Sequence, residues 1–566
     1  MRHILLALAF ACALAHAVPV TPALAATHEG DAAFAAAAAP APKAAPGFVV
    51  ENAIPGSHIE APVALAFTPD GRLLVADVPG RIWVIANGVQ LPTPMWARES
   101  EVEINGDCGL LGMALDPLFA LNRRLYLFYA VDPDSNGADD DTLHFGRLVR
   151  YEVSASDPNR IDESTRTVLL GTSWSDGVPN YSGTHSVGAL RFAADGTLLV
   201  SMGEGARYDV ADPGGLSVGL FEPGRAPLAW DRGAFRAQDL DVPGGKILRV
   251  DPATGRGLPS NPFWNGDPGA VRSKVWAYGL RNPFRFCVRP YTGSTDPADG
   301  APGTLYVGDV GWNLWEELNV VRAGGQDFGW PYREGARANA PYAALAPPYA
   351  GQTAPGPLTD PALALYHPSA DTNGVFAARA NSITSGLFYT AQQFPAPWRG
   401  RFVFGDFYRG WIHAAQFDAD DRLVTSDLLA SNMNGPVDFA IEPSTGWLYV
   451  ACIIDDRVRR IRWSPTADVA SGAPERVTWG EPWPNPVTDG AAALLTLPRE
   501  SRVSFDVLDV RGRRVWADAP RTCAVGATRL AWDGRDGAGA RVAPGLYFLR
   551  VTVDGRALSR RVSVLR

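Results

Sequence analysis

A short pattern recurs along most of this chain of 566 residues: a polar turn containing Asp, Gly or Asn, a brief apolar run, a second turn and a second run. Each occurrence is typical of two antiparallel strands. Six segments carry it: FTPDGRLLVADVPGRIWVI, LDPLFALNRRLYLFYA, FAADGTLLVSMGEG, VRPYTG with GTLYVGDVG, WRGRFVFGDFYRGWI and IEPSTGWLYVACIIDDRVRRI. Such units, repeated over about 400 residues without helical periodicity, favour a β-propeller over an array of β-sandwiches. The sequence therefore predicts a six-bladed propeller.

The pattern changes near Pro465, and the segments beyond it alternate apolar and polar residues between D-G turns. About 90 residues of this kind have the size of an immunoglobulin-like β-sandwich. We therefore expect an all-β chain, in which residues 48–464 form the propeller, 465–480 a linker and 481–566 the sandwich. The sandwich shows no titratable cluster that suggests catalysis.

The N-terminal residues have the features of an export signal. Residues 1–25 combine a basic start, an apolar run from Ile4 to about Ala17 and an A-x-A pattern that ends at Ala25. A membrane anchor is the alternative, although the run is shorter than the ~18–20 residues that span a bilayer. Residues 26–47 are mostly Ala and Pro, as in a flexible tether. We expect an exported protein without a transmembrane segment that is periplasmic, secreted or attached to the cell surface.

Charge and cysteine usage exclude some classes of function. The chain has 60 acidic and 51 basic residues, a net charge of −9, which argues against nucleic-acid binding. The cysteines outside the signal are far apart and show no C-x-x-C spacing, so neither a zinc site nor a redox motif is indicated. They are Cys108, Cys287, Cys452 and Cys523. Buried free thiols are the preferred interpretation, while an oxidising compartment also permits a disulfide.

Two segments hold candidate chemistry. His185 precedes a predicted strand, and Glu204 ends the next one, so Glu204 could orient the imidazole of His185 as a general base. Arg281 and Asn282 stand before a proline, where they could present an anion-binding pair. The nearby carboxylates could bind a hard cation: Asp309, Glu316 and Glu317. Structural hydrogen bonds, salt bridges between blades or solvated turns are the alternatives for each of these residues.

Seven blocks in one order carry a family resemblance. They are DCGLLGMALDP, THSVGALRFAADGTLLVSMGEG, FRAQDLDVPGGKILRVDPATG, WAYGLRNPFRF, GDVGWNLWEELN, AGGQDFGWP and NSITSGLFYTAQQFP. From about Phe48 to Trp463 the chain resembles the soluble glucose/sorbosone dehydrogenases, which are six-bladed propellers that use pyrroloquinoline quinone (PQQ) and calcium. The resemblance implies a sugar substrate, with His185 as catalytic base and Glu204 as its supporting carboxylate.

The same resemblance implies further roles. Asp107 falls at a substrate-contacting position, and Asp209 is assigned to the substrate with it. Arg281 and Asn282 match the pair that holds the quinone side of the cofactor. The expected calcium ligands are the carbonyls of Gly311 and Trp312 at one site, and Glu317 with the carbonyl of Phe328 at a second, structural site.

The chain also departs from the glucose-oxidising members, which hold the cofactor's carboxylates with one lysine and two arginines. The matching positions here are Tyr408, Gly435 and Val437, and Val310 replaces a cofactor-contacting glutamine. Each lost charge-assisted hydrogen bond costs ~1.5–3 kcal/mol, so tight PQQ binding is not expected unless Arg409 compensates.

Two further likenesses bear on function. The block GDVGWNLWEELN is closer to the hedgehog-interacting-protein-like branch, some of whose members bind partners without oxidising sugar. The C-terminal module resembles the immunoglobulin-like domain of flagellar hook-capping proteins and the sorting domains of type IX secretion substrates, through VLDVRGRRV and WDGRDGAGARVAPGLYFLRV. That likeness implies contact with cell-surface sorting machinery.

The preferred hypothesis is an exported PQQ-type dehydrogenase that oxidises an aldose or related polyol, with calcium as a Lewis acid and an electron acceptor that the sequence does not identify. The alternative is a non-catalytic, calcium-stabilised propeller that binds a carbohydrate or protein ligand. A calcium-dependent lactonase is a third hypothesis, but the sequence shows no clear set of oxygens for its ion.

Overall fold

The computed structural model describes residues 41–135, 143–181, 183–343, 345, 357–367, 380–464, 477–480, 482, 487, 490–524 and 526–565. The chain divides into two compact units, residues 1–464 (unit 1) and 465–566 (unit 2). The predicted signal peptide and residues 26–40 of the predicted tether lie outside the described residues. Among the residues that the structure describes, no helix has the length and apolar character needed to span a membrane.

The described part of unit 1 is built from six antiparallel sheets of four or five strands. The first sheet contains β3 (Pro62–Phe67), β4 (Leu73–Asp77), β5 (Arg81–Ala86), β6 (Val89–Gln90) and β7 (Trp96–Ala97). The second contains β8 (Leu110–Leu115), β9 (Arg124–Val131), β10 (Leu143–Val153), β11 (Ile161–Leu170) and β12 (Val178–Tyr181). The third contains β13 (Val187–Phe192), β14 (Leu198–Met202), β15 (Lys246–Val250) and β16 (Val275–Tyr278).

The other three sheets complete unit 1. The fourth sheet contains β17 (Arg285–Val288), β18 (Leu305–Asp309), β19 (Trp315–Val321) and β22 (Leu363–Tyr366). The fifth contains β23 (Ile383–Phe388), β24 (Phe402–Asp406), β25 (Ile412–Phe417), β26 (Leu423–Ser431) and β1 (Lys43–Ala44). The sixth contains β27 (Pro436–Ile441), β28 (Leu448–Cys452), β29 (Arg457–Trp463) and β2 (Phe48–Asn52). A separate hairpin pairs β20 (Arg333–Glu334) with β21 (Arg337–Ala338).

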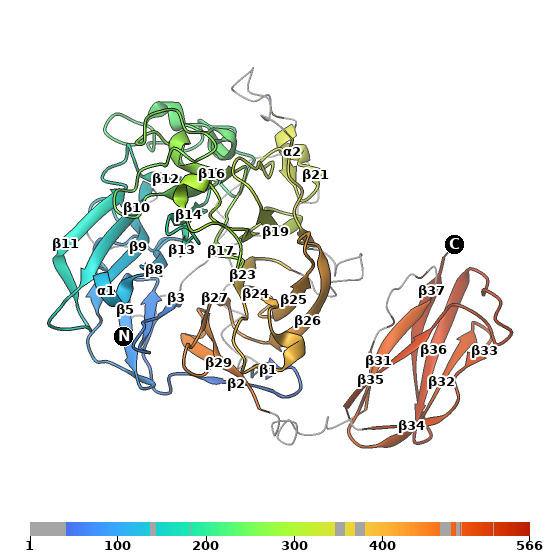
Figure 1. The fold of residues 1–566 in the computed structure, drawn as a ribbon. Helices are drawn as coiled ribbons and strands as arrows, with labels where there is room; N and C mark the ends of the chain where they lie inside the picture. Colours follow the sequence, from blue (N-terminus) through green and yellow to red (C-terminus); the bar gives the residue numbers. More distant parts are fainter. Residues whose placement is uncertain are drawn as a thin grey trace, which may run out of the picture. The chain divides into compact units, whose positions relative to one another are not determined.

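The first strand of each sheet contacts the first strand of the next. The contacts run from β3 to β8, β13, β17, β23, β27 and back to β3, so these six strands form a closed ring, and their labels gather around the middle of unit 1 (Figure 1). The last sheet joins the two ends of the unit, because β2 pairs with β29 with Phe48 opposite Trp463. The strands of this ring are largely buried, as expected where apolar runs meet neighbours on both faces.

The end of the predicted tether is ordered, which corrects the boundary at residue 47. β1 pairs with β26, with Lys43 opposite Ser431. The N–H of Ala45 donates to the carbonyl oxygen of Leu429 at 2.9 Å. A two-residue strand at a sheet edge gains its hydrogen bonds from a partner almost 400 residues away, and an Ala/Pro-rich composition gives no sign of that pairing.

Helices are short in the described chain. They are α1 (Phe119–Asn122), α2 (Ala340–Ala343) and the 3₁₀ segments Leu228–Trp230, Gly233–Gln238, Arg272–Lys274, Pro297–Asp299 and Ala396–Trp398. Two of these segments lie in the long connection between β14 and β15.

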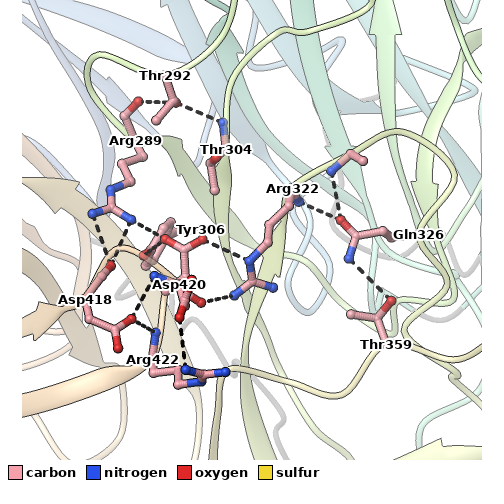
Figure 2. A network of polar contacts seen from close by, with 12 residues as sticks. Arg289, Thr292, Thr304, Tyr306, Arg322, Gln326, Thr359, Asp418, Asp420 and Arg422 are labelled. Carbon is pink, nitrogen blue, oxygen red and sulfur yellow. Dashed lines mark hydrogen bonds and ion pairs between the residues drawn. The ribbon is translucent and has the colours of Figure 1, made fainter.

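A polar network joins the sheets that contain β18 and β25 (Figure 2). Its centre is Asp421, in the turn between β25 and β26. The carboxylate of Asp421 accepts hydrogen bonds from the hydroxyl of Tyr306 at 2.7 Å and from Nε of Arg322 at 2.9 Å, and it pairs with Arg289. The backbone oxygen of Asp420 accepts from Nη2 of Arg322. Because Asp421 is almost fully buried, these bonds satisfy a charge that would otherwise be costly at a sheet junction.

Unit 2 contains two antiparallel sheets in its described residues. One has β30 (Thr478–Trp479), β31 (Ala491–Leu497) and β35 (Gly526–Trp532), and the other has β33 (Arg514–Ala517), β32 (Ser501–Asp509), β36 (Gly545–Val553), β37 (Arg556–Val564) and β34 (Arg521–Cys523). Trp479 is buried in the core of this unit, so the end of the predicted linker 465–480 belongs to its first sheet. All four cysteines outside the predicted signal peptide are buried free thiols.

Candidate functional site

Most of the predicted site residues lie at one end of the six sheets. Asp107, His185 and Arg281 come just before the first strands β8, β13 and β17, while Glu204 follows the second strand β14 and Gly311 follows β18. In an antiparallel pair, the start of one strand lies beside the end of its neighbour. The repeated strand order thus brings residues from different sheets to the same end of the ring.

His185 and Glu204 form a buried pair. Nδ1 of His185 lies 3.0 Å from Oε1 of Glu204, and both side chains are about 98–99% buried. The second oxygen of Glu204, Oε2, is buried without a hydrogen-bond partner among the described residues. When Nδ1 carries the hydrogen of this contact, Nε2 is the nitrogen left to accept a proton.

The backbone of His185 is held in an unusual conformation. Its φ is 50°, in the left-handed region, and its N–H donates to Oδ2 of Asp107 at 3.0 Å. Gly203, directly before Glu204, packs against the same peptide: a Cβ at Gly203 would lie 2.2 Å from the carbonyl oxygen of His185. Asp107 and Gly203 therefore fix the position from which His185 meets Glu204.

Burial shifts the protonation equilibria of this group. Desolvation raises the pKa of Glu204 to about 8 and that of Asp107 to about 6. The pKa of His185 falls well below its usual value, chiefly through desolvation and also through the nearby positive charge of Arg281. A neutral imidazole is the form that can accept a proton, so the site holds its candidate base in the competent state near neutral pH.

Arg281 and Asn282 are anchored by Asp309, at the end of β18. The carboxylate of Asp309 accepts the N–H of Arg281 at 3.0 Å and the N–H of Asn282 at 2.7 Å. Nη1 of Arg281 donates to the carbonyl oxygens of Val310 at 3.0 Å and Gly311 at 2.7 Å. The buried Nε of Arg281 has no hydrogen-bond partner in the described chain. The sequence suggests Asp309 only as a cation ligand, because its anchoring role depends on a register that sequence does not reveal.

A cavity lies next to these residues, and its wall is mostly apolar. Its polar lining residues are Asp107, Asn282, Ser382 and Thr384, whereas His185, Glu204 and Arg281 are not among its lining residues. The apolar lining consists of Val63, Val78, Leu111, Phe284, Val310, Phe407, Val437 and Ile453. None of the described lining residues is Arg, Lys or His. Two of the positions where cofactor-binding groups were expected, 310 and 437, therefore present aliphatic side chains to this space.

Three further positions discussed for the site, Asp209, Tyr408 and Arg409, also lie outside the lining of the cavity. Asp209 is exposed and forms an ion pair with Arg207, which lowers the pKa of Asp209. Arg409 is exposed, and its Nη2 lies 3.3 Å from Oδ1 of Asn381, so it does not replace the missing cations on the cavity wall. Tyr408 is 42% exposed beside it. These three sit in connecting loops, whose course the strand pattern does not determine.

Two of the expected calcium ligands, the carbonyl of Gly311 and the carboxylate of Glu317, already have hydrogen-bond partners within the protein. The carbonyl of Gly311 accepts from Arg281, and the carboxylate of Glu317 accepts from the N–H of Gly335 at 2.6 Å and from Nδ2 of Asn319 at 2.9 Å. The indole N–H of Trp312 donates to the carbonyl oxygen of Tyr208 at 2.6 Å. The described residues include no group of three or more His, Cys, Asp and Glu side chains arranged to hold a metal.

The three carboxylates that the sequence suggested as a cation site do not all meet, because only Asp309 and Glu317 lie opposite each other. Glu316 and Glu317 are successive residues of β19, so they point to opposite faces of the sheet. Glu316 contacts Nε2 of His367 and accepts the N–H of Ile383 at 2.8 Å. Glu317 lies opposite Asp309 in register, and burial raises the pKa of Glu317 to about 8. Phe328 packs in a separate apolar cluster.

Comparison with known proteins identifies relatives of unit 1. The family model described as Glucose / Sorbosone dehydrogenase matches residues 59–459. Aldose sugar dehydrogenase YliI of Escherichia coli (strain K12) is 28% identical over 279 residues, 48% of this chain and 59% of that protein. HIPL2 protein of Arabidopsis thaliana is 26% identical over 428 residues, 66% of this chain and 54% of that protein. The hedgehog-interacting protein of Mus musculus is 26% identical over 249 residues, 41% of this chain and 31% of that protein. The chain thus spans between about a third and three fifths of these curated relatives.

Solved structures share the fold. The apo form of the soluble aldose sugar dehydrogenase of Escherichia coli superposes with a TM-score of 0.52 and 21% identity, covering 74% of this chain and 99% of that one. An oxidoreductase of Thermus thermophilus described as a glucose dehydrogenase gives a TM-score of 0.51 and 24% identity, covering 73% and 99%. At these identities the likeness establishes the fold of the matched region.

Proposed function

Because the chain belongs to the glucose/sorbosone dehydrogenase family, we propose that it is a PQQ-type dehydrogenase that oxidises a hydroxyl group of an aldose or related polyol. The proposal includes residues 48–464 as a six-bladed β-propeller, supported by the closed ring of six first strands. It also includes residues 481–566 as an immunoglobulin-like sandwich for sorting or attachment of an exported protein, supported by the two antiparallel sheets of unit 2.

The observation that carries the enzymatic proposal is the buried contact between His185 and Glu204. Oxidation of CH–OH to a carbonyl releases a proton from oxygen and a hydride from carbon. Nε2 of His185 would take the proton, while Nδ1–H donates to Oε1 of Glu204 and keeps the ring in that tautomer. The imidazolium that forms would be stabilised by Glu204 once its carboxyl group ionises, a step that its raised pKa of about 8 opposes near neutral pH.

PQQ is the hydride acceptor that the family implies, and it brings a redox-active quinone when bound. The residues present suit only one end of it. The amide of Asn282, which lines the cavity, would suit a quinone oxygen, whereas Val310 and Val437 offer nothing to its carboxylates. The site as a whole therefore does not fit PQQ in the way that the glucose-oxidising members hold it. The proton transfer assigned to His185 and Glu204 involves only side chains of this chain.

A second candidate function rests on that apolar wall. Without cations for an anionic cofactor, unit 1 could act as a non-catalytic propeller that binds a carbohydrate or protein ligand. The similarity to HIPL2 and hedgehog-interacting proteins is compatible with such a role. In that case His185 would contact a ligand and would transfer no proton.

Replacing His185 distinguishes the two. His185→Asn retains a residue that tolerates the left-handed backbone but removes the base. We expect PQQ-supported dye reduction with a panel of aldoses and polyols to fall by a factor of about 10² to 10⁴ in this variant. His413→Gln, at a buried histidine on β25, is the matched control and should retain activity. Near wild-type turnover by His185→Asn would refute the enzymatic assignment.

A further inference from the structure

The peptide that leads into the candidate base is held from both sides. Nδ2 of Asn180, in β12, donates to the carbonyl oxygen of Thr184 at 2.5 Å. The N–H of His185 belongs to the same planar peptide unit, and it donates to Oδ2 of Asp107 at 3.0 Å. Asn180 and Asp107 therefore fix the plane of the peptide from which the side chain of His185 starts.

The peptide that follows the base is fixed as well. The carbonyl oxygen of His185 accepts the N–H of Gly205 at 3.1 Å. With both flanking peptides held, the φ of 50° at His185 is imposed by its neighbours. A residue with a side chain keeps this left-handed conformation only where the surrounding structure holds it there. Loss of one of these bonds would let the backbone relax and would move the imidazole away from Glu204.

β12 also packs on the segment that carries Glu204. A Cβ at Gly205 would lie 2.3 Å from the carbonyl oxygen of Pro179, so the two backbones are in direct contact. Oγ1 of Thr184 donates to the carbonyl oxygen of Ala206 at 3.1 Å. The end of β12 therefore determines where both members of the buried pair begin.

The chemistry of Asn180 indicates a role beyond packing. Its side chain is fully buried, and Oδ1 has no hydrogen-bond partner among the described residues. An unsatisfied buried oxygen is unfavourable, and an apolar side chain of similar shape would avoid it. Turning the amide over would place Oδ1 against the carbonyl oxygen of Thr184, so Nδ2 is the atom that faces this carbonyl. Asn180 is not among the lining residues of the cavity, so it acts through the peptide and not on a ligand.

We infer that Asn180 is a positioning residue for His185. Its amide holds the peptide before the base so that Nδ1 of the ring meets Oε1 of Glu204. The inference rests on the proposed function, since the position of the ring matters for turnover only if His185 takes a proton. The contact itself can be followed without turnover.

One-dimensional ¹H NMR of the full-length protein reports the contact between the ring and the carboxyl group. An imidazole N–H that donates to a carboxyl group resonates downfield of the amide protons. We expect one such signal that disappears in His185→Asn, which assigns it to His185. The contact between His367 and Glu316 supplies an internal reference, assigned by its loss in His367→Gln. If no downfield signal depends on His185, the ring is not held by Glu204 and the inference fails.

Asn180→Leu removes the donor and retains the size of the side chain. We expect the His185 signal to shift or disappear while the His367 signal stays unchanged. In PQQ-supported dye reduction, kcat should fall about 10- to 100-fold with KM changed less than about threefold, because Asn180 places the base and touches no ligand. An unchanged His185 signal in this variant would overturn the inference.

A second pair of variants covers the case in which leucine does not fold at this position. Asn180→Ala removes the same donor without a branched side chain, and it should also displace the His185 signal. Asn261→Ala is the matched control, because Asn261 is buried and its Nδ2 likewise donates to backbone carbonyls, those of Arg249 and Ser273. This control should leave the His185 signal unchanged. Loss of the signal in both alanine variants would attribute it to general loosening and would contradict a specific role for Asn180.

The two proposals fail in different ways. The spectra do not depend on turnover, so a displaced His185 signal in Asn180→Leu, with no dye reduction by the wild type, would contradict the proposed function and leave the positioning role standing. An active wild type with an unchanged signal in Asn180→Leu would do the reverse.

Discussion

Two sides of the same site differ in chemistry. On one side, His185, Glu204, Arg281 and Asp309 are buried and linked by hydrogen bonds that run from β14 to β18. On the other side, the cavity wall around Val437 offers aliphatic and aromatic surface without a cation among the described lining residues. The polar side holds the groups that we propose for proton abstraction, while the apolar side offers no cationic side chain to an anionic cofactor.

The two sides of the site also affect the stability of the protein differently. Buried ionisable groups such as Glu204, with a pKa raised by desolvation to about 8, reduce stability when they are forced to ionise. Apolar side chains that line a dry cavity cost the folded state little free energy. Substitutions on the polar side should therefore change stability and activity more than substitutions on the apolar side.

The largest expected effect on the polar side comes from Gly203→Ala. The added Cβ would lie 2.2 Å from the carbonyl oxygen of His185, so the backbone that carries the base must move. We expect a loss of about 3 kcal/mol or more in the free energy of unfolding, together with loss of activity. Denaturant titration followed by tryptophan fluorescence measures the first quantity. Gly537→Ala, where a Cβ meets only an ordinary contact at 3.8 Å, is the control, and equal losses in both variants would contradict a special role for Gly203.

Glu204→Gln should have a smaller and pH-dependent effect. Folded Glu204 titrates near pH 8, whereas an unfolded glutamate titrates near 4.5, so between these values the folded state binds the extra proton. The free energy of unfolding of the wild type therefore decreases as the pH rises through this range. Glutamine cannot ionise, so the variant should gain on the order of 3 kcal/mol relative to wild type between pH 4.5 and pH 8.5. Unfolding curves at the two pH values test this, and a difference that does not change with pH would show that Glu204 is ionised throughout.

Sequence predicted the parts of this molecule that depend on local pattern. The six strand doublets anticipated an all-β unit, and the place of His185 before one strand and Glu204 after the next anticipated their meeting. It did not anticipate contacts set by distant partners. The pairing of β1 with β26 and the anchoring of Arg281 by Asp309 are examples.

Local patterns also failed where neighbours in sequence point apart. Glu316 and Glu317 looked like one cation site, but strand alternation sends them to opposite faces. Asp209 lies only five residues after Glu204, yet its loop carries it to the surface and into an ion pair with Arg207. Alternation within a strand is predictable once the strand is recognised, whereas the course of a long loop depends on packing that one sequence does not encode locally.

The contrast between the two sides is tested most directly by isothermal titration of the full-length protein with PQQ, in the wild type and in Val437→Arg. We expect wild-type binding to be weaker than about 10 μM, because charge-assisted bonds to the carboxylates are missing, and the added cation to tighten it at least about tenfold. Submicromolar binding by the wild type, with no gain from Val437→Arg, would contradict the claim that the apolar side offers no group that binds the carboxylates.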